Sequence, residues 1–476
     1  MLKANSQKLT VNRRGFSALE MLLVLGLIVL LLGAAALVGF RDQPAKNRNT
    51  ERRNEVNAIK DALTQWSLDT GTYTPSNVPT VATCVSNCNE VVALVRQDCT
   101  GYSNCFTSLF AWEAGYGGID FGSCMQGDLV CAGKSAVAKI DGAWTSADTT
   151  RFSINGWTTS LNNYIKIYTT PEARHTGKWD ATKYRMEIPG ATNYYIIENY
   201  ENYVHIDGLQ LSATAPPSGF QDAITAENLA GSGEILISNN IISLAGATNT
   251  GSGISTNSSP NIVVKAWNNV FIGGGYGMYI YGTHYVYNNV FYNCNNGIRK
   301  VGATAIIVAK NNITQNCNDG YGGTFSPSSD YNISDLAGDA PGANSQNSIT
   351  VSFVDTTNRD FHLSPGDTAA KDKGADLSAD ANLAVKGDID SQVRTGSWDI
   401  GVDEYGASGV ASAICYDLKP ILTPAYFSEM PVDPLAKNSC PFGDTGYTIY
   451  KDTATKEIVI GAPMAENGET IQAIRK

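Results

Sequence analysis

The chain has 476 residues, enough for about three domains of ordinary size, and 43% of them are hydrophobic, so it can bury a large core. Its formal charge of −11 disfavours binding to nucleic acid or to an anionic lipid surface, and no nucleic-acid partner is expected. Ten cysteines stand beside four scattered histidines without any paired CxxC spacing. We therefore expect disulfides rather than a metal site, and no cofactor.

The first predicted element is an apolar helix. Residues 21–40 carry no charge, and as a helix of roughly 30 Å they are long enough to cross a bilayer. Residues 1–15 are basic and contain no acid, which keeps this end in the cytoplasm and exports the rest of the chain. Three interpretations remain open: a secretory signal cut near residues 34–36, an uncut anchor, and a segment cut on the cytoplasmic side of its helix.

Glu20 stands at the start of this apolar helix, where an unpaired charge is costly in hydrocarbon. Together with Gly15, Phe16 and the basic leader, it resembles the class III signal of type IV pilins and type II secretion pseudopilins. The resemblance implies that a prepilin peptidase cuts after Gly15, that Phe16 becomes the methylated amino terminus, and that Glu20 pairs with the terminus of a neighbouring subunit. The other interpretation is that the helix dipole alone stabilises Glu20, which then reaches the headgroups.

The same resemblance implies where the protein is found and what it binds. It implies a single-pass protein of the inner membrane before assembly, and afterwards a subunit of an extracellular pilus or a periplasmic pseudopilus. The expected partners are other pilin subunits of the filament, the prepilin peptidase and the inner membrane.

A pilin has a long N-terminal helix followed by a small antiparallel sheet. An apolar stripe over residues 56–66 fits the continuation of the helix, and alternating runs at 445–453, 456–463 and 467–476 predict three strands. The predicted fold class is therefore an α+β pilin fold interrupted by an all-β right-handed parallel β-helix. Its predicted parts are a cleaved leader at 1–15, a transmembrane and stem helix with a loop at 16–98, the inserted domain at 99–406 and the C-terminal antiparallel sheet at 407–476.

An asparagine pair recurs through the inserted domain. Steps of 29, 20 and 23 residues separate the second members of four pairs, which are Asn239 and Asn240, Asn268 and Asn269, Asn288 and Asn289, and Asn311 and Asn312. A period in the twenties with short β-rich runs predicts a parallel β-helix in which these asparagines stack at one turn. The apolar residue after each pair is expected to face the core: Ile241, Val270, Val290 and Ile313.

The cysteines agree with this register. Cys294 follows Asn289 by five residues and Cys317 follows Asn312 by five, so the two should lie one above the other within disulfide reach. A disulfide and two buried free thiols would both fit. The other candidate disulfides join local pairs: Cys84 with Cys88, Cys99 with Cys105, Cys124 with Cys131, and Cys415 with Cys440.

The flanks of the inserted domain carry a second resemblance. The run at 153–186, and the runs RDFHLSPGDTAAKDKG and WDIGVDEYG at 359–374 and 398–406, are similar to the beginning and end of pectate-lyase-like right-handed β-helix domains. The resemblance covers roughly residues 102–405. It implies that the end motifs cap the last coil, with Trp398 and Tyr405 covering exposed core.

Some relatives of this fold are polysaccharide lyases or glycosidases, which need clustered acids for calcium or two carboxylates across a cleft. Residues 235–318 contain no acid, so the clearest coils cannot carry such a pair. Acids before them leave a site on earlier coils open: Glu198, Glu201, Asp207, Asp222 and Glu227. Arg174, His175 and Asp180 fit a structural corner better than a site, and the GDID run at 387–390 fits a solvated turn better than a calcium site. We predict no catalysis, with a membrane-anchored β-helix lyase or glycosidase as the alternative.

Tyrosines mark the candidate ligand surface. Alternation turns Ile280 and Val286 inward and leaves four tyrosines outward on adjacent strands, namely Tyr279, Tyr281, Tyr285 and Tyr287. Such rings suit stacking on sugars or contact with a protein, although tyrosines are also ordinary exposed residues of strands. The sequence thus predicts a structural subunit of a pilus or pseudopilus that displays its β-helix for adhesion to a glycan or a partner surface.

Overall fold

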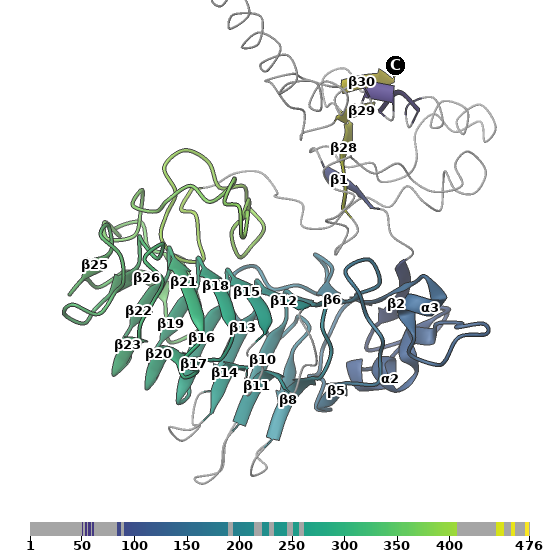
Figure 1. The fold of residues 1–476 in the computed structure, drawn as a ribbon, viewed down its shortest axis with the longest axis horizontal. Coiled ribbons are helices and arrows are strands. Elements are labelled where there is room, and N and C mark those ends of the chain that lie inside the picture. The colour runs from purple at the N-terminus through teal and green to yellow at the C-terminus, as the bar shows by residue number, and fades with distance from the viewer. Residues whose placement is uncertain are drawn as a thin grey trace, which may run out of the picture.

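The computed structural model (Figure 1) describes residues 50, 53–54, 56–58, 60, 83–86, 90–188, 194–213, 221–227, 233–244, 251–256, 261–406, 444–451, 458–461 and 472–475. Most of these residues belong to a parallel β-helix, in which the chain winds through three short strands per coil and each strand pairs with its counterpart in the next coil. The predicted parallel β-helix is therefore confirmed.

Three parallel sheets make up the wall of the β-helix. Sheet I contains β2 (Glu90–Val95), β3 (Cys105–Phe106), β4 (Ser135–Ile140), β6 (Ile165–Thr169), β9 (Val204–Asp207), β12 (Gly233–Ser238), β15 (Ile262–Trp267), β18 (Thr283–Tyr287) and β21 (Ile306–Lys310). Sheet II contains β7 (Met186–Ile188), β10 (Gln210–Ala213), β13 (Ile241–Leu244), β16 (Val270–Gly273), β19 (Val290–Tyr292), β22 (Ile313–Gln315), β24 (Ile333–Ser334) and β25 (Gln346–Asn347). Sheet III contains β5 (Phe152–Ile154), β8 (Tyr194–Asn199), β11 (Gln221–Ala226), β14 (Ser252–Ser255), β17 (Tyr276–Ile280), β20 (Asn296–Lys300) and β23 (Asp319–Gly322).

The asparagine pairs form the turn from sheet I to sheet II. The first asparagine of each pair has a left-handed backbone, with φ of 55°, 53°, 54° and 55° at Asn239, Asn268, Asn288 and Asn311, a conformation that asparagine tolerates better than most residues. The second asparagine is fully buried, and its side-chain amide donates to the next one at 3.0 Å, from Asn240 through to Asn332. The predicted asparagine stack is confirmed and extends one coil further, to Asn332.

The interior of the coils is filled by stacked apolar side chains. Phe271 and Phe291 lie in successive coils with ring centroids 4.7 Å apart and planes only 3° from parallel. Cys294 and Cys317 also lie in successive coils and form a disulfide with a Cα–Cα distance of 4.5 Å. The predicted stacking of the two cysteines is therefore confirmed, and of the two alternatives the disulfide is the one present.

The apolar residues after the asparagine pairs do not face this interior. Ile241, Val270, Val290 and Ile313 are buried on the outer side of sheet II, beneath residues 349–405. We call residues 349–405 the cover segment; it contains the hairpin of β26 (Phe353–Asp355) and β27 (Asp360–Leu363). Seven of its buried apolar residues pack with sheet II, namely Val351, Phe361, Leu363, Ala370, Ile389, Ile400 and Val402, and the partly buried Ile349, Phe353 and Ala369 pack against the same cluster. The predicted inward orientation is wrong because sheet II is buried on both faces.

The prediction that Trp398 and Tyr405 cap the last coil is wrong. Trp398 packs with Leu377, Leu383 and Val385 on the outer side of sheet I, against Tyr287, and does not close the last coil. Tyr405 is 46% exposed. In Figure 1 the light green chain lies above the later coils, beside β18 and β21, rather than across the end of the stack.

A small cap precedes the first coils. It contains α2 (Leu109–Ala114), η1 (Tyr116–Gly118) and α3 (Leu129–Ala132), with Trp112 buried and stacked on Trp157 at 5.9 Å. The predicted disulfides Cys99–Cys105 and Cys124–Cys131 are present in this cap. Cys88, Cys415 and Cys440 lie outside the described residues, as does the side chain of Cys84.

A separate antiparallel sheet combines one strand that precedes the β-helix in the sequence with three strands that follow it. Its order is β1 (Thr83–Ser86), β28 (Asp444–Lys451), β29 (Ile458–Gly461) and β30 (Gln472–Arg475), so the three C-terminal strands that alternation predicts are present.

The predicted α+β pilin fold is nevertheless wrong for the chain that the structure describes. The helices whose bounds it gives have six, three and four residues, and the architecture is almost entirely parallel β-sheet. In the described ranges no helix combines the length and apolarity needed to cross a bilayer, and the predicted single-pass membrane localisation is corrected accordingly. The apolar run at 21–40 lies outside those ranges, as do Gly15, Phe16 and Glu20.

Candidate ligand-binding face

The outer face of sheet III is the candidate site, because its side chains point away from the core in two parallel columns. The inward column between them contains Ile197, Ile224, Ile254, Met278 and Ile298. One outward column runs through Tyr195, Asp222, Ser252, Tyr276, Asn296 and Asp319. The other runs through Ser153, Glu198, Thr225, Ser255, Tyr279, Arg299 and Gly322. We call these two columns, together with Tyr281 directly after β17, the sheet III face.

Three partly exposed tyrosines form a cluster on this face. The ring of Tyr279 lies 4.9 Å from that of Tyr276 and 6.1 Å from that of Tyr281. Partial burial raises the pKa of Tyr279, so the phenol stays neutral at ordinary pH. The cluster therefore offers neutral aromatic surface with hydroxyl groups along its edge.

The sequence did not predict that Tyr276 is on the outer surface, because strict alternation from Ile280 would turn its side chain inward. In the structure two successive residues, Gly277 and Met278, face the core. A Cβ at Gly277 would lie 2.2 Å from the ring of Phe291, so only glycine allows the strand to approach the stacked phenylalanines so closely. Tyr276 and Tyr279 therefore both point outward, three residues apart.

The other two predicted tyrosines lie elsewhere. Tyr285 and Tyr287 are on sheet I, where Tyr287 is fully buried under the cover segment and its hydroxyl lies 3.3 Å from Asp380. Burial, together with the Asp380 carboxylate, raises the pKa of Tyr287 well above its usual value. The predicted surface of four tyrosines is thus divided between two sheets, and only Tyr279 and Tyr281 belong to the candidate face.

Carboxylates gather at the earlier end of the sheet III face. Glu198 accepts hydrogen bonds from the Ser153 hydroxyl at 2.7 Å and the Tyr200 hydroxyl at 2.8 Å. Asp222 accepts the Ser252 backbone amide at 2.6 Å, and Glu227 is hydrogen-bonded to the Tyr195 hydroxyl. Burial, with the nearby charge of Glu227, raises the pKa of Asp222 to about 6. This end of the face is therefore strongly anionic.

The other acids of the early coils have structural roles. Asp207 pairs with Arg174 at 2.6 Å and accepts hydrogen bonds from Ser238 and Asn239, also at 2.6 Å. Glu201 accepts the backbone amide of Trp157 at 2.8 Å. Both carboxylates are thus used inside the fold.

The predicted structural corner at residues 174–180 agrees with the geometry. His175 is buried with its Nε2 2.8 Å from the Asn239 carbonyl, and burial lowers its pKa to about 3. Asp180 instead accepts the Thr182 amide and hydroxyl at 2.8 and 2.6 Å. The corner therefore holds a neutral, structurally bonded histidine and no proton-transfer pair.

The GDID run lies in a cluster of charged groups within the cover segment. Ligand atoms of His362, Asp390 and Asp403 lie within 4.8 Å of one another, and His362 Nδ1 is 2.6 Å from Asp360. Although burial opposes the charged imidazole, its contacts with Asp390, Asp403 and Asp360 raise the pKa of His362 to about 9. A protonated histidine thus supplies the positive charge of an internal ion network. The predicted solvated turn is wrong, because Asp388 and Ile389 of the GDID run are 2% and 0% exposed.

This network predicts that the protein loses stability in alkali. The folded pKa of His362 lies above its ordinary value of 6.5, so its contribution is complete below pH 6.5 and is lost as the pH rises through 9. Between pH 7 and 10 we expect the free energy of unfolding to fall by roughly 2 kcal/mol more in wild type than in His362→Gln. Urea titrations at both pH values measure this difference, and equal losses would contradict it.

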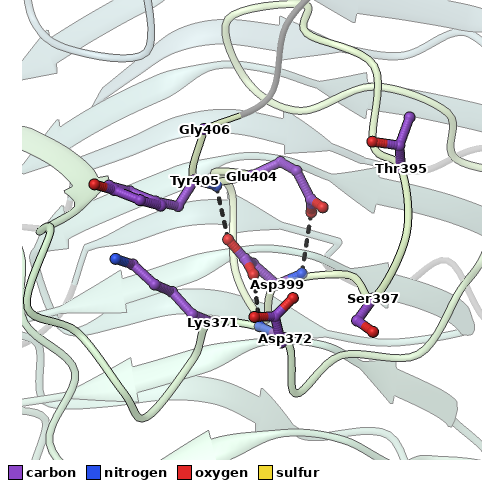
Figure 2. A pocket seen from close by; sticks show the side chains of 8 residues that line it. All are labelled: Lys371, Asp372, Thr395, Ser397, Asp399, Glu404, Tyr405 and Gly406. Atoms are coloured by element: carbon purple, nitrogen blue, oxygen red, sulfur yellow. Dashed lines mark hydrogen bonds between the residues drawn. The ribbon is translucent and has the colours of Figure 1, made fainter.

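A small pocket of about 130 Å³ lies where the cover segment ends (Figure 2). The Asp399 carboxylate accepts the amides of Asp372 and Tyr405 at 2.7 Å each, and Glu404 accepts the amide of Asp399 at 3.0 Å. Lys371 Nζ lies 3.2 Å from the centroid of the Tyr405 ring. Asp399 and Glu404 are therefore committed to backbone amides of the cover segment.

No protein-family model, curated protein or solved structure matches this chain. The pilin identification, which depended on Gly15, Phe16 and Glu20, thus gains no support from any family, and the fold described above contradicts it. Function must be argued from the residues of the candidate face.

Proposed function

We propose that the β-helix is a carbohydrate-binding module that serves adhesion to a glycan surface through the sheet III face. The main support for this function is the cluster of Tyr276, Tyr279 and Tyr281, whose rings are partly exposed and held by mutual contact. The apolar face of a sugar ring stacks on such rings at low entropic cost, because a packed tyrosine has few rotamers to lose.

The neighbouring coils support the same function. Next to the tyrosine cluster, Arg299 and Asn296 both contact Asp319, at 3.5 and 2.9 Å. Forked donors and acceptors of this kind hydrogen-bond the hydroxyls of a sugar. An aromatic platform beside fixed polar groups fits recognition of a carbohydrate better than burial against a large apolar protein interface.

Three groups of acids away from the sheet III face are committed to the fold and are not free for catalysis. Those of the corner, the pocket and the His362 network all accept internal hydrogen bonds or form ion pairs. A chain-cleaving enzyme needs two carboxylates free to reach one bond. A binding module needs only a stable surface, which stacked coils provide.

The test is a glycan array with the full-length protein. Replacing both Tyr279 and Tyr281 with alanine is expected to weaken binding to the best glycan at least about tenfold, because two stacking rings are lost. Tyr102→Ala, which removes a tyrosine that is 48% exposed on the cap, is the matched control and should bind as wild type does.

Three results would contradict the proposal. They are wild-type protein that binds no glycan, a double variant that binds as tightly as wild type, and a bound polysaccharide that becomes shorter with time. The last result would favour the lyase or glycosidase alternative.

A further inference from the structure

The acidic end of the sheet III face differs from the other charged parts of the fold. Among the described residues, Glu198, Asp222 and Glu227 form no ion pair with lysine or arginine. On sheet I of the same coils, by contrast, Glu234 pairs with Lys265 at 2.8 Å. The three carboxylates therefore concentrate negative charge that the described chain does not neutralise.

A buried hydroxyl lies in the same place. The Thr225 side chain is 0% exposed, and its Oγ1 has no hydrogen-bond partner among the described residues. Thr225 stands in the outward column between Glu198 and Ser255. Since an unpaired buried hydroxyl costs free energy, this position is suited to a hydrogen bond from a ligand group that reaches the floor of the face.

The arrangement does not suit a metal ion. Within the described ranges, His362, Asp390 and Asp403 form the group of three acidic or histidine side chains whose ligand atoms lie within 4.8 Å of one another. Glu198, Asp222 and Glu227 are spread over β8, β11 and the residue after β11. Negative charge spread along a surface suits a positive charge on an extended ligand.

We propose that this acidic end binds protonated amino groups of an amino-sugar polysaccharide whose next sugars stack on the tyrosine cluster. The inference rests on the proposed function. Three strand steps separate β8 from β17, and at about 4.8 Å each they span roughly 14 Å, which a short oligosaccharide can bridge. The ligand class is therefore a polymer of hexosamine with free amines, in preference to a neutral or fully N-acetylated one.

The test measures binding of three β-1,4-linked hexasaccharides to the full-length protein by calorimetry: glucosamine, N-acetylglucosamine and glucose. Wild type is expected to bind the glucosamine hexamer at least about tenfold more tightly than the other two. In Glu198→Gln/Glu227→Gln this preference should disappear, while affinity for the N-acetylated hexamer stays within about twofold. The isosteric Thr225→Val should weaken glucosamine binding severalfold.

Matched variants separate the two proposals. Glu172→Gln, which neutralises an exposed acid away from the face, should leave the preference intact. Tyr279→Ala/Tyr281→Ala should weaken all hexamers that bind, since it removes the platform. A wild type without preference for glucosamine, or a preference that survives Glu198→Gln/Glu227→Gln, overturns the amino-sugar inference but leaves glycan binding standing. A wild type that binds none of the three and no array glycan overturns both.

Discussion

Replacing Asn289 with alanine is expected to destabilise the β-helix by about 3 kcal/mol, a large fraction of the stability of a typical domain. The side chain is fully buried and forms five hydrogen bonds, four of them to neighbouring coils and one to the Tyr287 carbonyl of its own coil. Its Oδ1 accepts the backbone and side-chain amides of Asn269 at 2.9 and 3.0 Å, and its Nδ2 donates to Asn312 at 3.0 Å. Truncation leaves these buried groups without partners on both sides, so the loss exceeds that of one exchanged hydrogen bond.

The neighbouring asparagine provides the control. Asn288 is equally buried, but neither atom of its amide has a hydrogen-bond partner in the described chain, and its φ of 54° suits glycine. Asn288→Gly should therefore change the free energy of unfolding by less than about 1 kcal/mol. Urea denaturation followed by circular dichroism measures the free energy of unfolding of Asn289→Ala and Asn288→Gly. Equal destabilisation of the two variants would contradict the role of the second asparagine in holding the coils together.

The coil repeat could be predicted because its cause is local. A left-handed turn residue followed by a stacking amide recurs in the sequence at each coil, and Cys294 and Cys317 repeat at the same offset. The side of the wall on which Val270 and Val290 lie could not be predicted from the repeat. Two layers of apolar packing, one inside the coils and one under the cover segment, produce the same run of apolar residues.

The candidate face was only partly predictable for the same reason. Tyr279 and Tyr287 have equivalent patterns in the sequence, yet Asp380 and Trp398, about a hundred residues later, bury one of them. The pilin prediction depended on a short motif before residue 21 and on alternating strands near the C terminus. The strands are present, but an antiparallel sheet of four strands is common to many folds and does not identify a family.

The cover segment itself is expected to detach when Arg394 is replaced with methionine. The Arg394 side chain is 0% exposed and donates to the carbonyls of Asp399 and Gly401 at 3.1 and 2.7 Å and to Glu404 at 3.2 Å. Methionine fills similar volume but leaves the Glu404 carboxylate buried without its cation, which costs about 3 to 5 kcal/mol. The contacts of the segment with Val290 and Ile313, made near Gly401, are then expected to open.

Detachment has a specific signature, because the inner core of the coils does not include the cover segment. In Arg394→Met, limited proteolysis is expected to cleave within 349–405, and a hydrophobic dye should bind the uncovered faces of sheets I and II, while the far-ultraviolet β signal persists. Arg394→Met/Glu404→Gln should recover part of the protection, since the second change removes the unpaired charge. Lys178→Met, which breaks a half-exposed contact of 3.9 Å with Asp360, should cost less than about 0.5 kcal/mol. Equal protection of 349–405 in wild type and Arg394→Met would show that apolar packing alone holds the segment in place.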